Sequence, residues 1–318
     1  MRNVTLLTLQ NRLLSRARFR HMQVMVAVVE LGSLRRAADS LGMSQPAVSK
    51  VLADLESLLE LTLFERHARG VHATRECLEL LVLARLTVNG VATAAAALAA
   101  KDKGGEGTVR VAGTTAALNG LLACTARGFA EKFPRVQLQV SQAHVDDVLL
   151  AAARGEADVV LCRRLANPPE GWLFRPLLSD DFAVFCSPEH PLARRRKVSL
   201  TDMMRERWLP GHAAAASRRH LDQLAEEAGQ SLKLCEVMTV VSDLNWSVLR
   251  KSRLLMLAPR SVFRPHLEAG ELAVVRFERK LPFDPLGVLV PERASPPAAL
   301  RLVGYLHEVH APSDSQVE

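Results

Sequence analysis

The chain has 318 residues, of which 48% are hydrophobic and 24% charged, and its formal net charge is +7. This length supports two or three domains with a core in each, and no run of apolar residues is long enough to span a bilayer. The basic excess favours a polyanionic partner such as nucleic acid over an acidic substrate. We therefore expect a protein that works without a membrane, and its scattered cysteines without CxxC spacing favour a reducing cytoplasm.

The N-terminal end of the chain predicts an extension followed by a helix. Residues 1–18 carry arginines and no acidic side chain, and their apolar stretch is too short for a secretory signal. We predict that they form a disordered extension or precede the true start of the protein. The next segment, Phe19–Leu31, places Met22, Met25 and Val29 on one face and predicts a helix.

The stretch Ser33–Leu59 predicts two helices joined by a tight turn. Ser33 is a suitable N-cap for the first helix, and Gly42 is a suitable stop. Ser44 is a suitable N-cap for the second helix. Each helix has one apolar face, made of Leu34, Ala37, Ala38 and Leu41 in the first and of Val48, Leu52, Leu55 and Leu59 in the second.

The second of these helices leaves a polar edge free near its N-terminus. Two helices with so short a turn, the second carrying polar side chains, are typical of a helix-turn-helix. The spacing alone is equally compatible with a helical hairpin that only packs. The edge, called here the recognition edge, consists of Gln45, Pro46, Ser49 and Lys50, which we predict to enter the major groove of DNA.

A wing is predicted directly after the second helix. Two strand candidates, Leu61–Phe64 and Val71–Ala73, flank a turn at residues 67–70. Arg69, beside a glycine at the tip, can reach the minor groove or a phosphate, although a solvated surface arginine is the alternative. Phosphate contacts, which set register without reading sequence, are predicted for Arg35, Arg36 and Arg66.

A long helix rich in Ala, Leu and Val is predicted from Thr74 to about Lys101, with Thr74 as its N-cap. Its apolar residues recur every seven positions in two interleaved series, which is typical of a coiled-coil seam. Because few other surfaces are available to such a helix, we predict that it pairs with a second copy, although an ordinary core helix is the alternative. The two series are Leu81, Val88 and Ala95, and Ala84, Val91 and Leu98.

Residues 101–107, KDKGGEG, break the composition and predict a linker into a second body. Strands and helices then alternate in the order βαβαβ, which predicts right-handed crossovers and an open parallel sheet. The predicted strands are Thr108–Gly113, Val136–Ser141 and Ala157–Cys162, and the helices between them are Ala116–Phe133 and Val145–Arg154.

A second alternating block predicts a second lobe. Two α/β lobes joined by two crossings form a clamp like that of periplasmic binding proteins. Residues 282–292 would cross back to the first sheet, and Pro296–His310 would be the closing helix. The elements between are helices at Ser217–Gly229, Asp243–Lys251 and Ser261–Ala269, and strands at Leu232–Val241, Leu254–Leu257 and Leu272–Phe277.

The predicted fold class is therefore α+β and multidomain, with a winged helix-turn-helix, a long linker helix and a two-lobed α/β effector-binding domain. The domains are a winged helix-turn-helix at residues 19–74, a dimerisation helix at 75–101, a hinge at 102–107 and the effector-binding domain at 108–318. Within the effector-binding domain, lobe I comprises about residues 108–180 and 281–310, and lobe II comprises about residues 181–280.

An effector site is predicted at the carboxyl ends of the strands, near helix N-termini that favour anions. Thr114 and Thr115 follow the first strand, and Ser242 opens a helix of the second lobe. Plain N-capping is the alternative for each of them. Arg163 and Arg164 follow a buried strand, where an unpaired arginine is costly and a carboxylate ligand would satisfy it.

Residues 32–71, GSLRRAADSLGMSQPAVSKVLADLESLLELTLFERHARGV, resemble the DNA-binding segment of LysR-type transcriptional regulators. The shared features are AA in the first helix, SQPAVS at the start of the second, and LFER and RGV beyond it. The resemblance covers about residues 19–310 and is mostly positional after Gly107. The chain departs from the family at residues 75–80, where RECLEL lacks the usual glycine, and its late block lacks AGxG.

The resemblance implies a sequence-specific DNA-binding regulator whose linker helices dimerise, usually in a tetramer that bends its site. Its implied partners are palindromic promoter sites on double-stranded DNA, itself as homodimer or homotetramer, and a small-molecule effector; RNA polymerase is a further candidate. FRHMQ, SQPAVSK and VSDLNWSVLRKSRLLML are similar to a branch with regulators of protocatechuate degradation and of sugar-binding-protein expression. The expected effector is therefore a carboxylate, an aromatic acid or a sugar-derived molecule.

The sequence contains no nucleophile or metal motif such as GxSxG or HExxH, so we predict no catalytic residue, metal or cofactor. Two alternatives stay open: an architectural DNA binder that ignores ligands, and a small-molecule-binding protein or enzyme on the α/β lobes. Oxidant sensing through a cysteine pair, known in the resembled family, is also open. The scattered cysteines indicate neither a disulfide framework nor a zinc site and are Cys77, Cys124, Cys162, Cys186 and Cys235.

Overall fold

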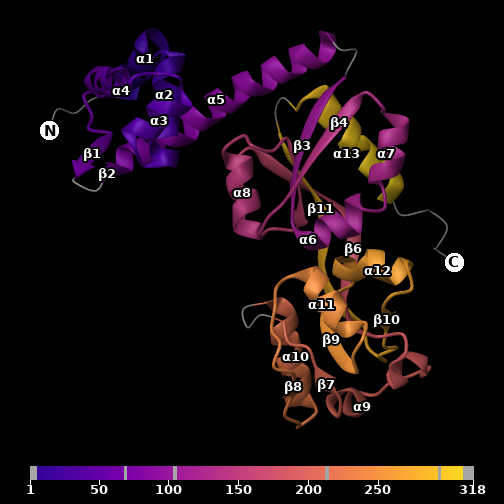
Figure 1. Cartoon of the computed structure of the whole chain (residues 1–318). Helices are drawn as coiled ribbons and strands as arrows, with labels where there is room; N and C mark the ends of the chain where they lie inside the picture. Colours follow the sequence, from indigo (N-terminus) through magenta and orange to yellow (C-terminus); the bar gives the residue numbers. More distant parts are fainter. Residues whose placement is uncertain (1–5, 68–69, 103–105, 212–214, 293–294, 311–318) are drawn as a thin grey trace. The chain divides into compact units, whose positions relative to one another are not determined.

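The computed structural model describes residues 6–67, 70–102, 106–211, 215–292 and 295–310. The chain forms two compact units, each described here by itself (Figure 1). The N-terminal unit ends at Gly104 and also takes in Leu150–Glu156, and the C-terminal unit comprises Gly105–Leu149 and Ala157–Glu318.

The N-terminal unit is a helical domain with a β-hairpin and one long helix. Its core is formed by wholly buried side chains of α2, α4 and the segment after α4, including Met25, Leu55 and Leu63. The elements are α1 (Leu6–Arg16), α2 (Phe19–Leu31), α3 (Leu34–Ser40), α4 (Gln45–Leu59), β1 (Phe64–His67), β2 (Gly70–Ala73) and α5 (Arg75–Asp102).

The predicted helix caps at the turn between α3 and α4 are confirmed. The hydroxyl of Ser33 accepts the N–H of Arg36 at 3.4 Å, and that of Ser44 accepts the N–H of Ala47 at 3.4 Å. Gly42 adopts a left-handed φ of +62°, which a side chain rarely tolerates. The local chemistry of this segment therefore fixes both helices and the sharp turn between them.

The prediction of a disordered extension over residues 1–18 is wrong for Leu6–Arg16, which form α1. Leu9 and Leu13 pack against the domain core, and Arg12 pairs with Glu60, with 2.7 Å between Nη2 and Oε1. The apolar side of α1 and the ion pair from Arg12 to Glu60, at the end of α4, together hold this helix against the domain.

The first strand of the wing lies three residues later than predicted. β1 spans Phe64–His67 and pairs antiparallel with β2, from Phe64 opposite Ala73 to His67 opposite Gly70. The N–H groups of Leu63 and Phe64 both donate to Glu56 Oε1, at 2.7 and 3.0 Å. The chain leaving α4 is therefore held by a side chain of that helix before the hairpin begins.

The C-terminal unit is an α/β body with two lobes. Lobe I contains β3 (Gly107–Gly113), α6 (Thr115–Ala117), the π-turn η1 (Leu118–Leu122), α7 (Ala126–Lys132), β4 (Val136–Gln142), α8 (Val145–Ala153), β5 (Val159–Arg163) and α13 (Pro297–His310). Lobe II contains η2 (Pro191–Arg194), α9 (Leu200–Met204), β7 (Arg207–Trp208), α10 (Ala216–Glu227), β8 (Lys233–Leu234), α11 (Ser242–Leu249), β9 (Leu254–Pro259), η3 (Arg260–Phe263), α12 (Arg264–Glu268) and β10 (Ala273–Val274).

Two long strands, β6 (Trp172–Cys186) and β11 (Leu281–Pro291), run through both lobes. The strand order is β4-β3-β5-β11-β6-β9-β7-β8, with β3 parallel to β4 and β5, and β11 antiparallel to β5 and β6. In lobe I, α7 and α13 cover one face of the sheet and α8 the other (Figure 1). At Gly287, a Cβ would come within 2.2 Å of the Arg175 carbonyl oxygen, so glycine permits the close approach of β11 to β6.

Several elements of this unit differ from their predicted form. The single helix expected over Ala116–Phe133 is broken into α6, the π-turn and α7, and the helix expected over Ser261–Ala269 is η3 followed by α12. The strand expected over Leu232–Val241 is only Lys233–Leu234. In the rest of that segment, Thr239, Val240 and Val241 line the cavities described below, and exposed valines account for the strand-like pattern.

Candidate functional site

The recognition edge lies on the exposed side of the first turns of α4. Gln45, Pro46 and Lys50 are exposed and Ser49 is half-buried. On the opposite side of the same helix, Val48 is wholly buried in the domain core. The helix is therefore anchored by its apolar face and presents these four polar or small side chains outward, as the sequence predicted.

The predicted phosphate contacts lie near this edge in sequence and differ in how far the structure describes them. Arg35 and Arg36 are exposed on α3. Arg66 belongs to β1, but its side chain lies outside the described residues, as does Arg69 entirely. The roles of Arg66 and Arg69 therefore remain predictions.

The heptad series of α5 divides between two environments. Leu81 is 5% exposed and Ala84 is wholly buried, and both lie in the core of the N-terminal domain. Val88 is partly buried against the same cluster. These residues are covered by their own chain, which corrects the prediction that Leu81 and Ala84 face a second copy.

Other apolar side chains of α5 are exposed instead. In the predicted series, Val91 is 50% and Leu98 is 68% exposed, and Ala95 is exposed as well. Sequence reasoning missed an exposed face formed by Leu78, Val82 and Leu86, which are 51%, 49% and 43% exposed. Their spacing of four residues places them on one side of the helix, and it was hidden because α5 is apolar on several sides.

One stretch of the described chain, Arg75–Ala95 of α5, is long and apolar enough to cross a membrane by length and composition, with a mean hydropathy of 1.5. The sequence had been expected to contain no such stretch. A single helix of this kind is weak evidence for a membrane. Only 17% of it is buried, so the stretch has an apolar surface that a partner helix could cover.

Two adjoining cavities, of about 280 and 410 Å³, lie between the lobes and form what is called here the cleft. Thr114, Thr115 and Ser242 all line it, as the sequence predicted for an effector site. The hydroxyl of Thr114 does not cap α6, and α11 has Val241 rather than Ser242 at its N-cap position. These hydroxyls are therefore not engaged in the capping that was the alternative explanation for them.

Asn245 on α11 is a cleft residue that sequence reasoning missed. It is 4% exposed, and its Nδ2 donates to the Thr239 carbonyl at 3.4 Å. Its buried Oδ1 has no hydrogen-bond partner within the described residues. A buried amide oxygen without a partner is costly, so a ligand hydroxyl donating to it would stabilise the complex.

The charged residues among the described lining of the cleft are acidic. Asp147 on α8 and Asp243 on α11 line the larger cavity, and no lysine or arginine lines either cavity in the part of the chain that the structure describes. The remaining polar lining is neutral apart from an imidazole and consists of Thr114, Thr115, Asn119, Gln142, His144, Ser217, Thr239, Ser242 and Asn245.

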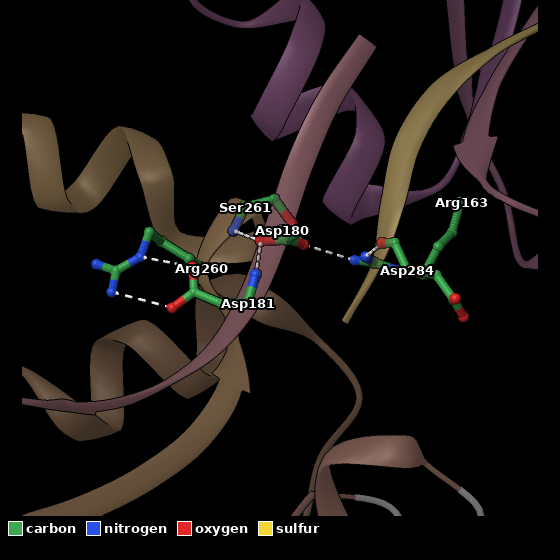
Figure 2. Close-up of polar contacts among 6 residues, drawn as sticks. All are labelled: Arg163, Asp180, Asp181, Arg260, Ser261 and Asp284. Atoms are coloured by element: carbon green, nitrogen blue, oxygen red, sulfur yellow. Dashed lines mark hydrogen bonds and ion pairs between the residues drawn. The ribbon is translucent and has the colours of Figure 1, made fainter. Parts of the chain in front are cut away.

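Arg163 and Arg164 do not line the cleft, which corrects the prediction that a ligand carboxylate satisfies them. Arg163 Nη2 donates to Asp180 Oδ2 at 2.7 Å, its Nη1 donates to the Asp284 carbonyl, and its guanidinium lies 3.9 Å from the Phe283 ring centroid (Figure 2). The guanidinium of Arg164 lies 5.9 Å from the ring centroid of Phe174. The chain itself supplies the carboxylate that half-buried Arg163 requires.

Asp180 is the centre of a polar network where β6 passes from lobe I to lobe II. Its Oδ2 accepts the hydroxyl of Ser261 at 2.6 Å and its Oδ1 accepts the N–H of Ser261 at 3.2 Å (Figure 2). The neighbouring Asp181 pairs with Arg260, at 3.1 Å between Oδ1 and Nε. We call Arg163, Asp180, Asp181, Arg260 and Ser261 the hinge network, because it joins β5 of lobe I to η3 of lobe II.

All five cysteines are free thiols, and Cys77, Cys162 and Cys186 are buried. Burial raises the pKa of the Cys77 thiol to about 11 and the pKa values of the Cys162 and Cys186 thiols to about 12. These three are therefore protonated and inert at neutral pH. Within the described ranges, no group of three or more His, Cys, Asp or Glu side chains is placed to hold a metal ion.

Family models match both parts of the chain. Residues 19–78 match the bacterial regulatory helix-turn-helix protein, lysR family, and residues 102–311 match the LysR substrate binding domain. The second match alone covers more than half of the chain.

Individual proteins agree with these matches. The chain is 27% identical over 276 residues to the HTH-type transcriptional regulator YdcI of Escherichia coli, covering 86% of this chain and 89% of that protein. It is 27% identical over 279 residues to the HTH-type transcriptional regulator GbpR of Azospirillum brasilense, covering 86% and 81%.

Solved structures share the fold. Full-length CbnR complexed with its target DNA matches with a TM-score of 0.65 at 18% identity, over 92% of this chain and 99% of that one. With a helix-turn-helix whose polar edge is free, a two-lobed body with a lined cleft, and both family models matched, this chain belongs to the LysR family of transcriptional regulators and is a DNA-binding regulator with an effector-binding domain.

Proposed function

We propose that this regulator reads a two-fold symmetric operator through the recognition edge and is switched by an uncharged, hydroxyl-rich molecule of the sugar class bound in the cleft. Gln45 and Ser49 would reach base edges, Pro46 would add apolar contact and Lys50 would bind an adjacent phosphate. The protein would work in the cytoplasm, where its DNA is.

The symmetric operator follows from the proposed pairing of two copies through α5. The exposed face of Leu78, Val82 and Leu86 offers apolar area outside the domain core, whereas Val91 and Leu98 are exposed on another side further along the helix. Because these side chains are already about half buried, covering the rest between two helices contributes about 1 kcal/mol each. Two paired DNA-binding domains then require half-sites separated by whole turns of DNA.

The effector class rests on one observation, the neutral and acidic lining of the cleft. Hydroxyl and amide groups can both donate to and accept from sugar hydroxyls. Asp147 and Asp243 oppose a bound carboxylate, because like charges repel at the distances across a small cavity. The N-terminus of α11 favours an anion by about 0.3–1 kcal/mol, but Asp243 lies in its first turn and already provides one.

The DNA-binding part is tested by footprinting the full-length protein on its own upstream DNA. Wild type should protect a symmetric site, and Gln45→Ala and Ser49→Ala should lose specific protection while they remain folded. Equal binding of wild type and both variants to specific and random DNA would contradict the proposal. A footprint that is unchanged by every ligand tested would favour the architectural alternative.

The effector class is tested by calorimetry with matched pairs of ligands, D-galactose with D-galacturonate and D-glucose with D-glucuronate. At least one neutral sugar should bind. Its acid, which carries a carboxylate in place of the C6 hydroxymethyl group, should bind about tenfold more weakly because Asp147 and Asp243 repel the charge. Asn245→Leu should abolish the binding of the sugar. Tighter binding of the acids, or sugar binding that survives Asn245→Leu, would overturn this assignment.

A further inference from the structure

A further cavity, of about 650 Å³, lies on the lobe II side of the crossing strands. It is bounded by residues 179–184 of β6, by Arg260, by residues 274–277 at and after β10, and by residues 279–282 at the start of β11. None of these residues lines the cleft. The cavity is therefore a separate space in the same body.

The rim of this cavity is rich in cations. Arg260 and Arg279 have counter-ions, in Asp181 at 3.1 Å and in Glu227 at 2.7 Å. Arg276 and Lys280 are exposed, and neither has an ion-pair partner among the described residues. Asp180 and Asp181 also line the cavity, but they are paired with Arg163 and Arg260. Arg276 and Lys280 therefore leave two positive charges without an ion-pair partner in the described chain at this opening.

The floor of the cavity is apolar. Phe182, Val184 and Val275 are between 2% and 3% exposed, and Leu281 and Pro282 complete the wall. Cations above an apolar floor suit a ligand with an anionic group and an apolar body. A solvated turn with surface arginines would account for the charges but would bind no such ligand saturably.

We infer that this cavity is a second ligand site, for an organic anion with an apolar body such as an aromatic carboxylate, and that it acts on the hinge network. Arg260 carries the connection, because it lines the cavity, pairs with Asp181 and directly precedes Ser261, which donates to Asp180. An anion that pairs with Arg260 competes with Asp181 for it. The strands that join the lobes then lose one of their contacts to η3.

This inference goes beyond the proposed sugar site, and it makes the two ligands thermodynamically linked. If an anion at the cation-rimmed cavity changes the relative stability of the lobe arrangements, it changes the affinity of the cleft for its own ligand. The cleft ligand must then change the affinity for the anion by the same factor.

The test is calorimetry on the full-length protein with benzoate as the probe, inorganic phosphate as a charge without an apolar body, and benzyl alcohol as an apolar body without charge. Benzoate should bind saturably, and the other two should bind about tenfold more weakly or not at all, since each lacks one half of the recognition. The double variant Arg276→Gln/Lys280→Gln should weaken benzoate binding about tenfold. The matched variant Lys251→Gln/Arg253→Gln, which removes the same charge from exposed positions elsewhere in lobe II, should not.

The position of the bound benzoate is decided by a cleft variant. Asn245→Leu should leave benzoate affinity unchanged, whereas loss of benzoate binding in that variant would place the anion in the cleft and overturn the inference. Absence of saturable benzoate binding, equal binding of phosphate, or equal weakening by both double variants would also overturn it. Operator binding and sugar binding are measured on the same samples, so a failure here is separate from a failure of the proposed function.

Discussion

Arg163 and Asp180 form an ion pair across the crossing of the two lobes, with 2.7 Å between Nη2 and Oδ2 and only 15% and 3% of their side chains exposed. Asp180 is also bound by the hydroxyl and N–H of Ser261 on the lobe II side. The pair therefore ties β5 of lobe I, through β6, to η3 of lobe II. Removal of this pair should therefore lower the stability of the whole effector-binding domain.

We expect Asp180→Asn to destabilise the protein by about 3 kcal/mol, because it leaves the guanidinium of Arg163, only 15% exposed, without a counter-ion. The measurement is urea unfolding of the full chain. The control is Asp181→Asn, whose pair with Arg260 is 37% and 45% exposed and should cost less than about 1 kcal/mol. Equal costs for the two variants would contradict the special role of Asp180.

Gln45→Ala and Ser49→Ala should each weaken specific DNA binding by about 1–3 kcal/mol, the value of a good contact to a base edge. The thermal unfolding temperature should hardly change, because Gln45 is exposed and Ser49 only half-buried. Ser57→Ala, at an exposed position near the other end of α4, is the matched control and should leave affinity unchanged. Loss of affinity in all three variants would show that α4 is merely destabilised.

Lys50→Gln and Arg35→Gln should weaken binding to every sequence alike and lower the salt dependence. If each side chain neutralises one phosphate, the slope of log K against log salt should fall by about 1 per substitution. Lys132→Gln, on α7 of the C-terminal unit, is the control for a general change in net charge. A slope that is the same in wild type and Lys50→Gln would rule out a phosphate contact.

Val82→Asp should shift the protein from dimer toward monomer, because it places a charge on the exposed apolar face of α5. Thr87→Asp, at an exposed position away from that face, should not. Ala84→Asp should unfold the N-terminal domain instead, since Ala84 lies in its core. Sedimentation and circular dichroism separate these outcomes, and an unchanged sedimentation coefficient for Val82→Asp would refute the proposed pairing.

His190 should make the protein less stable in mild acid. Burial lowers the pKa of His190 below its ordinary value, against the opposing charge of Glu206, and Nδ1 accepts the N–H of Leu192 at 3.1 Å. The unfolded chain keeps the ordinary pKa and binds the proton first as pH falls. Stability is therefore complete above about pH 6.5 and declines below it, until the pH reaches the folded pKa.

His190→Asn should reduce this decline, because the amide oxygen can still accept the N–H of Leu192 but does not titrate. The measurement is the free energy of unfolding at about pH 7.5 and 5.5, on either side of the ordinary histidine pKa. His307→Asn, at a half-buried position on α13, is the comparison. If the acid decline is as steep in His190→Asn as in wild type, His190 is not its source.

The features read correctly from the sequence are those that short-range chemistry controls. The caps at Ser33 and Ser44 and the turn at Gly42 depend on backbone geometry within a few residues. The apolar period of α4 fixes which side is buried, and with it which side carries Gln45. Thr114 and Ser242 line the cleft because the ends of strands and the starts of helices meet at one edge of an α/β sheet.

The sequence by itself thus determined the family, the order of the domains and the edge that α4 exposes, since these follow from local patterns. Only the tertiary structure decided that Ala84 faces its own domain, because a helix that is apolar on several sides does not specify its neighbour. Only the tertiary structure showed that the counter-ion of Arg163 is Asp180, seventeen residues along the chain. A buried charge must be paired, but which group pairs with it depends on distances that exist only after folding.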